Sequence, residues 1–309
     1  MAYIGRRIVQ ALISILGIAT IVFFSLHLSG DPVLLMVPPD ASANDIEVLR
    51  HALGLDQPLG VQYIDYLKNL FTGDLGRSYI QSRPVAEIIL QRFPYTIQLA
   101  ACALFLSVAV GIPVGMLSAI YRGKWVEKIL MPLILIGQSM PAFWTGILLI
   151  MLVSVHWHWL PSSGVGGFKS LIMPSVTLAS LSMATLARMT RSSFLEQLGQ
   201  DYVRTARSKG AGVIRLIGRH ILRNAAIPII TLVGMETANL LGGAVITETI
   251  FAWPGLGQLM IQAINARDFP LVQAIVLFIS VIYIVINLIT DLVYVMVDPR
   301  IKLGKEASS

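Results

Sequence analysis

The sequence predicts an all-α membrane protein with six transmembrane helices, both termini in the cytoplasm, a large extracytoplasmic loop and a long cytoplasmic loop. Two observations carry this prediction: long uncharged segments and an uneven distribution of basic residues. About 20 apolar residues span the hydrocarbon core as a helix, and each span must hydrogen-bond its own backbone there. The apolar segments are Ile8–Gly30, Phe93–Tyr121, Ile129–Phe168, Ser170–Ala187, Asn224 to beyond Ala244, and Phe269–Thr290.

The basic residues orient these helices. Sixteen of the 23 Lys and Arg residues precede the first segment, follow the sixth, or lie between the second and third or the fourth and fifth. Short basic loops stay in the cytoplasm, so both termini are predicted to be inside. The net charge of +6 is then an orientation signal, and nucleic-acid binding is not expected. Cys102 is alone within a predicted span, which excludes an internal disulfide.

The same features divide the chain into four parts. Residues 1–30 form the first transmembrane helix, which is too long for the apolar region of a signal peptide and lacks an Ala-x-Ala site. Residues 31–92 form the extracytoplasmic loop with short helices. Residues 93–298 form a five-helix core that includes the cytoplasmic loop 188–224, and residues 299–309 form a cytoplasmic tail. The outer loop is interpreted either as a solvated lid or as a docking surface for an external partner.

The cytoplasmic loop predicts two helices separated by a glycine turn. Ser193–Glu196 fits a capping box, and Asp201 is placed to cap a short helix over Tyr202–Lys209, with Gly210 ending it. A second, amphipathic helix is expected after Gly212 and before Pro228. Its apolar face comprises Val213, Leu216, Ile217, His220 and Ile221, and its basic face Arg215, Arg219 and Arg223.

Two interpretations of this loop stay open at this point. A basic amphipathic helix can rest on anionic lipid headgroups, which accounts for the second helix. It does not account for the short polar helix before Gly210. A protruding knob of two helices suits insertion into a groove on a cytoplasmic protein.

A few polar residues fall within or beside the predicted spans, where a charge costs about 2.5–3.5 kcal/mol or more at the bilayer centre. Such residues either line a pathway or pair between helices, and we expect pairing more than ligand contact. Glu248 is expected near the outer end of the fifth span. The candidates for pathway or interhelical contact are Gln138, Glu236, Asn239, Asn287 and Asp291.

The sequence His156-Trp157-His158-Trp159 lies at the end of a predicted span. Two His at i and i+2 need further ligands to hold a metal, and none is identifiable. Trp and His at this position are typical of an aromatic belt at the membrane surface. We therefore expect no metal site here.

Several short sequences, in order along the chain, carry a resemblance to a known family. They are Gly73-Asp-Leu-Gly-Arg-Ser78, Arg83-Pro-Val85, Arg92-Phe-Pro94, Ser139-Met-Pro141, Leu160-Pro161, Ala187-Arg-Met-Thr-Arg-Ser192, Asp201-Tyr-Val-Arg-Thr-Ala-Arg-Ser-Lys-Gly210, Arg219-His-Ile-Leu-Arg-Asn224 with Pro228, Glu248-Thr-Ile-Phe-Ala-Trp-Pro-Gly-Leu-Gly257, Arg267-Asp-Phe-Pro270 and Asp298-Pro-Arg-Ile301.

Nearly the whole chain resembles the inner-membrane permease subunits of binding-protein-dependent ABC importers, in the branch that handles dipeptides, oligopeptides and nickel. The general cytoplasmic signature of that family reads Glu-Ala-Ala, three residues, Gly, nine residues, Ile-x-Leu-Pro. Aligned on Gly210, this chain has Arg204-Thr205-Ala206 and His220-Ile221-Leu222-Arg223. Only the second Ala, the Gly and the Leu match, and the departures resemble the variant of the peptide and nickel branch.

The resemblance implies a type I importer permease that works by alternating access in a bacterial inner membrane. It implies no catalytic residue and no cofactor in this chain; two cytoplasmic ATPase subunits would bind ATP and Mg²⁺. The other implied partners are a second related permease, an extracytoplasmic substrate-binding protein and membrane lipid. The residues implied to contact the ATPase are Tyr202, Arg204, Thr205, Ala206, Lys209 and Gly210.

The implied cargo is a di- or oligopeptide, glutathione-like peptides included, with nickel or a metal chelate as the alternative. Pairing with an identical permease or with a relative also stays open. A secondary transporter or channel is the rival outside the family, and copurification of an ATPase would distinguish it. The chain itself lacks the Gly-x4-Gly-Lys-Ser/Thr loop that holds the phosphates of ATP.

Overall fold

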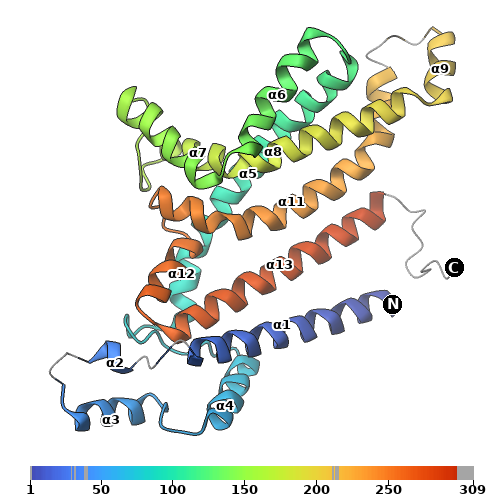
Figure 1. The fold of residues 1–309 in the computed structure, drawn as a ribbon. Helices are drawn as coiled ribbons and strands as arrows, with labels where there is room; N and C mark the ends of the chain where they lie inside the picture. Colours follow the sequence, from blue (N-terminus) through green and yellow to red (C-terminus); the bar gives the residue numbers. More distant parts are fainter. Residues whose placement is uncertain are drawn as a thin grey trace. The chain divides into compact units, whose positions relative to one another are not determined.

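Helices make up most of the described chain, as predicted, and the strand-like feature among these residues is an isolated β-bridge between Arg77 and Pro84. The computed structural model describes residues 2–28, 30, 33–37, 41–210, 212 and 216–297. In chain order the helices are α1 (Ala2–Leu28), α2 (Val33–Met36), α3 (Ala43–Ala52), α4 (Leu59–Thr72), α5 (Val85–Ile120), α6 (Trp125–Ser139), α7 (Ala142–Leu149), the π-helix η1 (Ile150–His156), α8 (Phe168–Leu198), α9 (Asp201–Ser208), the π-helix η2 (Leu216–Ile221), α11 (Leu222–Ile250), α12 (Leu256–Asn265) and α13 (Phe269–Val297) (Figure 1).

Contacts group the helices into two compact units. The first unit holds residues 1–95 and 255–282, and the second holds residues 96–254 and 283–309. Two long helices, α5 and α13, therefore contribute one end to each unit. The predicted outer loop and the start of α13 belong to the first unit, whereas the whole predicted cytoplasmic loop belongs to the second.

Four helices are long and apolar enough to cross a membrane: α5, α8, α11 and the Phe269–Thr290 part of α13. A fifth candidate is the pair formed by α6 and the Ala142–His156 segment, which is bent by 105°. The apolar part of α1, Val9–Ser25, is shorter than the length taken for a membrane span. The chain is thus a multi-pass helical protein, and the count of six spans stays a prediction.

The third apolar segment does not form the single continuous span that Ile129–Phe168 predicted. The helix stops at Ser139, and Met140 is extended with φ −100° and ψ 135° before Pro141 starts the next helix. A proline ring clashes with a helical conformation of the preceding residue, which explains the break at this point. The helical part of the segment ends at His156, well before Phe168.

Two glycines bring α5 and α8 into backbone contact within the second unit. A Cβ atom on Gly111 would lie 2.7 Å from the Met183 carbonyl oxygen, and one on Gly115 would overlap the carbonyl oxygen of Ala187. Small residues at such spacing let two helices approach closely inside a membrane. The crossing fixes α8, the helix that leads into the predicted cytoplasmic loop.

We expect Gly115→Ala to destabilise the protein by about 1–3 kcal/mol. The added methyl group meets backbone atoms of α8, which can move away only if the helix itself shifts. Gly242→Ala is the matched control, since a Cβ atom there has nothing within 4 Å. The thermal unfolding midpoints of both variants in one detergent check this prediction. Equal midpoints for Gly115→Ala and Gly242→Ala would show that the crossing is looser than the structure has it.

The first unit has its own apolar core. Val85, Ile88 and Ile89 of α5 pack there against α12 and the first turns of α13. Outside this core, α3 begins with a capping box: the Asp45 amide donates to Ser42 Oγ at 3.2 Å, and the Ser42 amide donates to Asp45 Oδ2 at 3.1 Å. The Ser42 hydroxyl also donates to Asp45 Oδ2. This hydrogen bond and, to a smaller extent, that of the Ser42 amide hold the pKa of Asp45 below its ordinary value.

Candidate functional site

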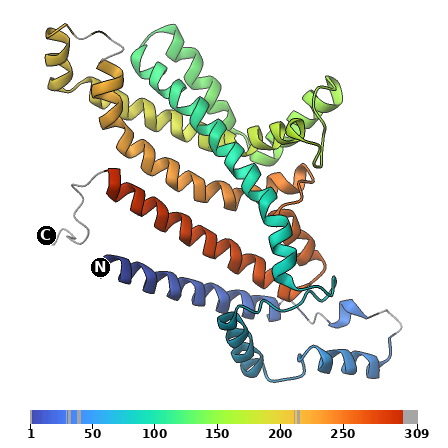
Figure 2. The same cartoon turned by 180° about the vertical axis from the view of Figure 1, so that it is seen from behind.

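The short helix α9 lies at one end of the pair formed by α8 and α11 in both views (Figures 1 and 2). It spans Asp201–Ser208, within one residue of the predicted bounds. The Gln200 carbonyl accepts from the amides of Val203 and Arg204, so Asp201 lies inside the first turn and does not cap the helix as predicted. Its carboxylate still lies near the positive end of the helix dipole.

One face of α9 is buried in the second unit. Val203 is fully buried in an apolar cluster with Phe194 of α8 and Ile221 of η2, while Tyr202 and Ala206 pack against the edge of that cluster. The Tyr202 hydroxyl donates to Gln197 Oε1 at 2.7 Å. This packing anchors the helix to the end of α8 and the start of α11.

The opposite face of α9 is exposed. Arg204 and Thr205 lie there, followed by Lys209 and Gly210 in the turn. Arg204 forms an ion pair with Asp201 at 3.7 Å, and both side chains are more than three-quarters exposed, so the pair is weak. The predicted contact residues thus divide into an anchoring set, Tyr202 and Ala206, and a set accessible to another protein.

Gly210 ends the α9 region in the left-handed conformation, with φ +78°, as the sequence predicts. The predicted separate second helix is wrong in its boundary. A π-helix over Leu216–Ile221 runs directly into α11, and Pro228 lies inside that helix. Val213 and Arg215 lie outside the described residues, as do the side chains of Arg219 and His220.

The predicted capping box at Ser193–Glu196 is also wrong. Both residues lie inside α8, which continues without a break to Leu198, so no helix begins there. The pattern is common in sequences and has no meaning where helical hydrogen bonds continue through it. The described chain has its capping box at Ser42 and Asp45 instead.

An ion pair near the same end of α8 was not predicted. Arg191 of α8 donates through Nε to Glu127 Oε1 at 2.7 Å and also through Nη2 to the same oxygen. The Gly123 amide donates to Glu127 Oε2 at 2.6 Å. The carboxylate therefore ties the start of α6 to α8. Glu127 and Arg191 are 64 residues apart and lie in separate helices. No local sequence pattern could therefore have predicted that they pair.

We expect a double-mutant cycle of Glu127→Ala and Arg191→Ala to give a coupling energy of about 1 kcal/mol, since both side chains keep partial access to solvent. Thermal unfolding of the two single variants and the double variant measures it. Strictly additive effects would contradict a stabilising pair.

Two buried carboxylates lie in α11. Glu236 is 8% exposed and accepts from Ser182 Oγ of α8. Glu248 is fully buried in the last turn of α11, at the end expected from the sequence, and accepts from Thr96 Oγ1 of α5 at 2.7 Å. Both contacts join helices, which is the kind of interaction that we expect for polar groups in spans.

The other polar candidates are spread over several helices. Gln138 in the last turns of α6 and Asn287 in α13 are half-buried, whereas Asn239 of α11 is exposed. Asp291 lies in α13, and its side chain is outside the described residues.

The His156–Trp159 sequence ends η1 with exposed side chains, and Trp157 stacks on Trp159 with ring centroids 4.7 Å apart. Among the described residues no group of His, Cys, Asp and Glu has the arrangement of a metal site. The stacked Trp pair fits an aromatic belt.

In the first unit, Asp268 joins two sequences that are far apart in the chain. Its carboxylate accepts from the Ser78 hydroxyl and, at 3.1 Å, from the Tyr79 amide. Asp268 is 1% exposed and Ser78 is 2% exposed. Both residues belong to sequences quoted above, Gly73–Ser78 and Arg267–Pro270, but nothing in either shows that they meet. This contact fixes the outer loop to the start of α13.

Comparisons with known proteins add to this geometry. The family described as "Binding-protein-dependent transport system inner membrane component" matches residues 111–303, and the family of its N-terminal part matches residues 1–100. The chain belongs to this permease family. It is therefore a multi-pass inner-membrane component of a transport system and not itself an enzyme.

Two groups of relatives are similar over almost the full length of this permease. The glutathione transport system permease protein GsiC of Salmonella typhimurium is 40% identical over 97% of this chain and 98% of its own. The dipeptide transport system permease protein DppB of Escherichia coli is 40% identical over 99% and 100%.

Solved structures agree on the fold of the permease. The MetNI methionine ABC transporter in an inward-facing conformation matches with a TM-score of 0.61 and 18% identity, over 70% of this chain and 99% of that one. An amino acid ABC transporter crystallised with histidines matches with a TM-score of 0.53 and 19% identity, over 70% and 95%. The fold is thus that of type I ABC importer permeases, as predicted.

Proposed function

We propose that this permease forms half of the translocation pathway of an ATP-driven importer for di- and oligopeptides. The observation that carries the proposal is the 40% identity to dipeptide and glutathione permeases over nearly every residue of the chain. Because the match extends through both compact units, it covers the outer segments as well as the cytoplasmic loop. Glutathione, itself a small peptide, belongs to the same class of cargo.

The second part of the proposal is that α9 is the coupling helix, bound by a cytoplasmic ATPase subunit. Its inner face is packed against α8, η2 and α11, while Arg204, Thr205 and Lys209 remain accessible on the outer side. A short helix fixed to the ends of two membrane helices transmits a displacement as a rigid body. Two such ATPase subunits would bind ATP and Mg²⁺, and their closure would move α8 and α11.

The remaining partners follow from the family and complete the proposed assembly. A second, related permease supplies the other half of the pathway, and an extracytoplasmic binding protein delivers the peptide to the 31–92 segment. Glu236 and Ser182 join α8 to α11 between the coupling helix and the outer end. We assign this contact a role in keeping the two helices together as they move.

Uptake by a strain that lacks this chain, with and without complementation, tests the cargo. Labelled dialanine, labelled glutathione and labelled nickel are measured in parallel. Loss of peptide uptake, restored by complementation, is expected. Selective loss of nickel uptake would replace the peptide proposal by the metal alternative, and loss of neither would show another cargo. Copurified ATPase subunits are expected; a chain that transports without them would be a secondary transporter or channel.

A further inference from the structure

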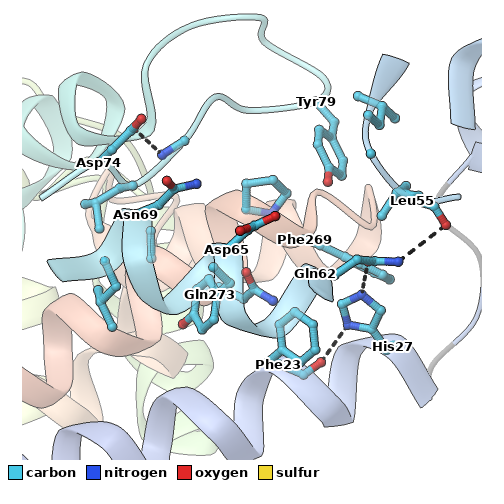
Figure 3. A pocket seen from close by; sticks show the side chains of 18 of the residues that line it. Phe23, His27, Leu55, Gln62, Asp65, Asn69, Asp74, Tyr79, Phe269 and Gln273 are labelled. Carbon is cyan, nitrogen blue, oxygen red and sulfur yellow. Dashed lines mark hydrogen bonds between the residues drawn. The ribbon is translucent and has the colours of Figure 1, made fainter. Parts of the chain in front are cut away.

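The first compact unit contains a cavity of about 280 Å³. It is formed by the end of α1, the residues before and within α4, the 74–79 segment and the start of α13 (Figure 3). Pockets that hold small ligands begin at about 300 Å³. The cavity is therefore just below the lower limit of size for a small ligand and can take one end of a peptide.

The polar lining of the cavity is acidic. Asp65 and Asn69 rise from α4 toward the space, Asp74 lies beyond them, and the Tyr79 hydroxyl faces α4 from the loop (Figure 3). The lining residues include these two carboxylates and neither Lys nor Arg. His27 also lines the space, with its two ring nitrogens next to the Phe23 carbonyl oxygen at 2.8 Å and Gln62 Oε1 at 3.1 Å.

Neither carboxylate is fully used within the unit. Asp74 accepts through Oδ1 from the Gly76 amide at 2.8 Å, and its second oxygen has no donor in the part of the chain that the structure describes. Asp65 accepts through Oδ1 from Lys68 Nζ at 3.0 Å, and these side chains are 54% and 69% exposed. An ion pair so exposed contributes little and is readily exchanged for another cation.

Aromatic rings complete the wall. Phe23 and Tyr66 stack with centroids 5.5 Å apart, and Phe269 and Tyr79 line other parts of the space. Ring faces attract a cation within about 6 Å of the centroid. The Tyr66 hydroxyl oxygen is buried and has no hydrogen-bond partner in the described part of the chain. Burial raises the pKa of Tyr66 to about 12, so this hydroxyl stays neutral and can accept from an N–H donor.

We propose that this cavity binds the α-ammonium group of the transported peptide. The proposal rests on the proposed function and names two charged residues, Asp65 and Asp74, that lie outside the candidate span helices. The two carboxylates supply charge, the amide and hydroxyl oxygens accept the ammonium hydrogens, and the rings surround them. A carboxylate ligand would instead face Asp65 and Asp74 with no Lys or Arg among the lining residues to compensate.

Equilibrium binding of tritiated dialanine to the full chain in lipid nanodiscs tests the proposal. We expect N-acetyl-dialanine to compete at least tenfold more weakly than dialanine, because acetylation removes the positive charge. Asp65→Asn combined with Asp74→Asn should weaken dialanine binding at least tenfold. Asp56→Asn is the matched control, since Asp56 is an exposed acid of the same unit that does not line the cavity. Equal thermal unfolding midpoints show that the variants fold.

Two results would overturn the proposal: equal competition by the acetylated peptide, or unchanged binding in the double variant. The n-butylammonium ion, a probe without peptide groups, separates this proposal from the function. If it binds with the same dependence on Asp65 and Asp74 while dialanine is not imported, the ammonium site stands and the proposed cargo fails. If dialanine is imported but neither probe depends on the carboxylates, the cargo stands and the ammonium site fails.

Discussion

Gly210→Pro should lower peptide uptake at least tenfold while the protein still reaches the membrane. Gly210 has φ +78°, which a proline ring, fixed near −65°, cannot adopt. The chain would then leave α9 in another direction and displace Arg204, Thr205 and Lys209 from the positions that we propose for the ATPase contact. Among the described residues, nothing lies within 4 Å of a Cβ atom at Gly210, so the effect is expected to act through the backbone and not through a clash.

Gly210→Asn is the matched control, because asparagine tolerates the left-handed conformation better than other side chains. It should retain most of the uptake. The measurement is labelled peptide uptake, together with ATP hydrolysis by the reconstituted complex and the amount of ATPase that copurifies. Normal uptake by the proline variant, with normal assembly, would remove the coupling role from this turn.

The sequence was sufficient for the parts of the fold that local physics determines. Apolar segments of about 20 residues require helices in a bilayer, so α5, α8, α11 and α13 follow from composition alone. Gly210 ends a helix by a short-range rule, and α9 lies within one residue of the predicted bounds, although Asp201 is inside the helix and not its cap. Pro141 was a sequence signal for the helix break before it, but the uninterrupted apolar segment Ile129–Phe168 was interpreted as a single span.

Contacts between distant residues could not be predicted in this way. Glu127 with Arg191 and Ser78 with Asp268 are separated by 64 and 190 residues, and each partner taken alone is an ordinary polar residue. The Gly111 and Gly115 crossing has the spacing of a helix contact, but only the structure shows that α8 is its partner. The division of α9 into an anchored and an accessible face likewise needed the positions of Phe194 and Ile221.

Asp268→Ala should destabilise the first unit by roughly 2–4 kcal/mol, because it leaves the Ser78 hydroxyl and the Tyr79 amide without their acceptor. Ser78 is almost completely buried, so water cannot replace the lost carboxylate without opening the structure. The 74–79 segment would then separate from the start of α13. We expect a lower thermal unfolding midpoint and faster proteolysis of this segment in the reconstituted protein.

Asp268→Asn keeps one carbonyl oxygen for the Tyr79 amide and should lie between wild type and the alanine variant. Asp56→Ala, at an exposed acid of the same unit, should change the midpoint little. If Asp268→Ala and Asp56→Ala had the same thermal unfolding midpoint, the buried contact would contribute no net stability. A loss confined to Asp268→Ala would show that the outer segment is held in place by this carboxylate, and peptide uptake should fall with it, since the cavity proposed for the ammonium group includes Tyr79.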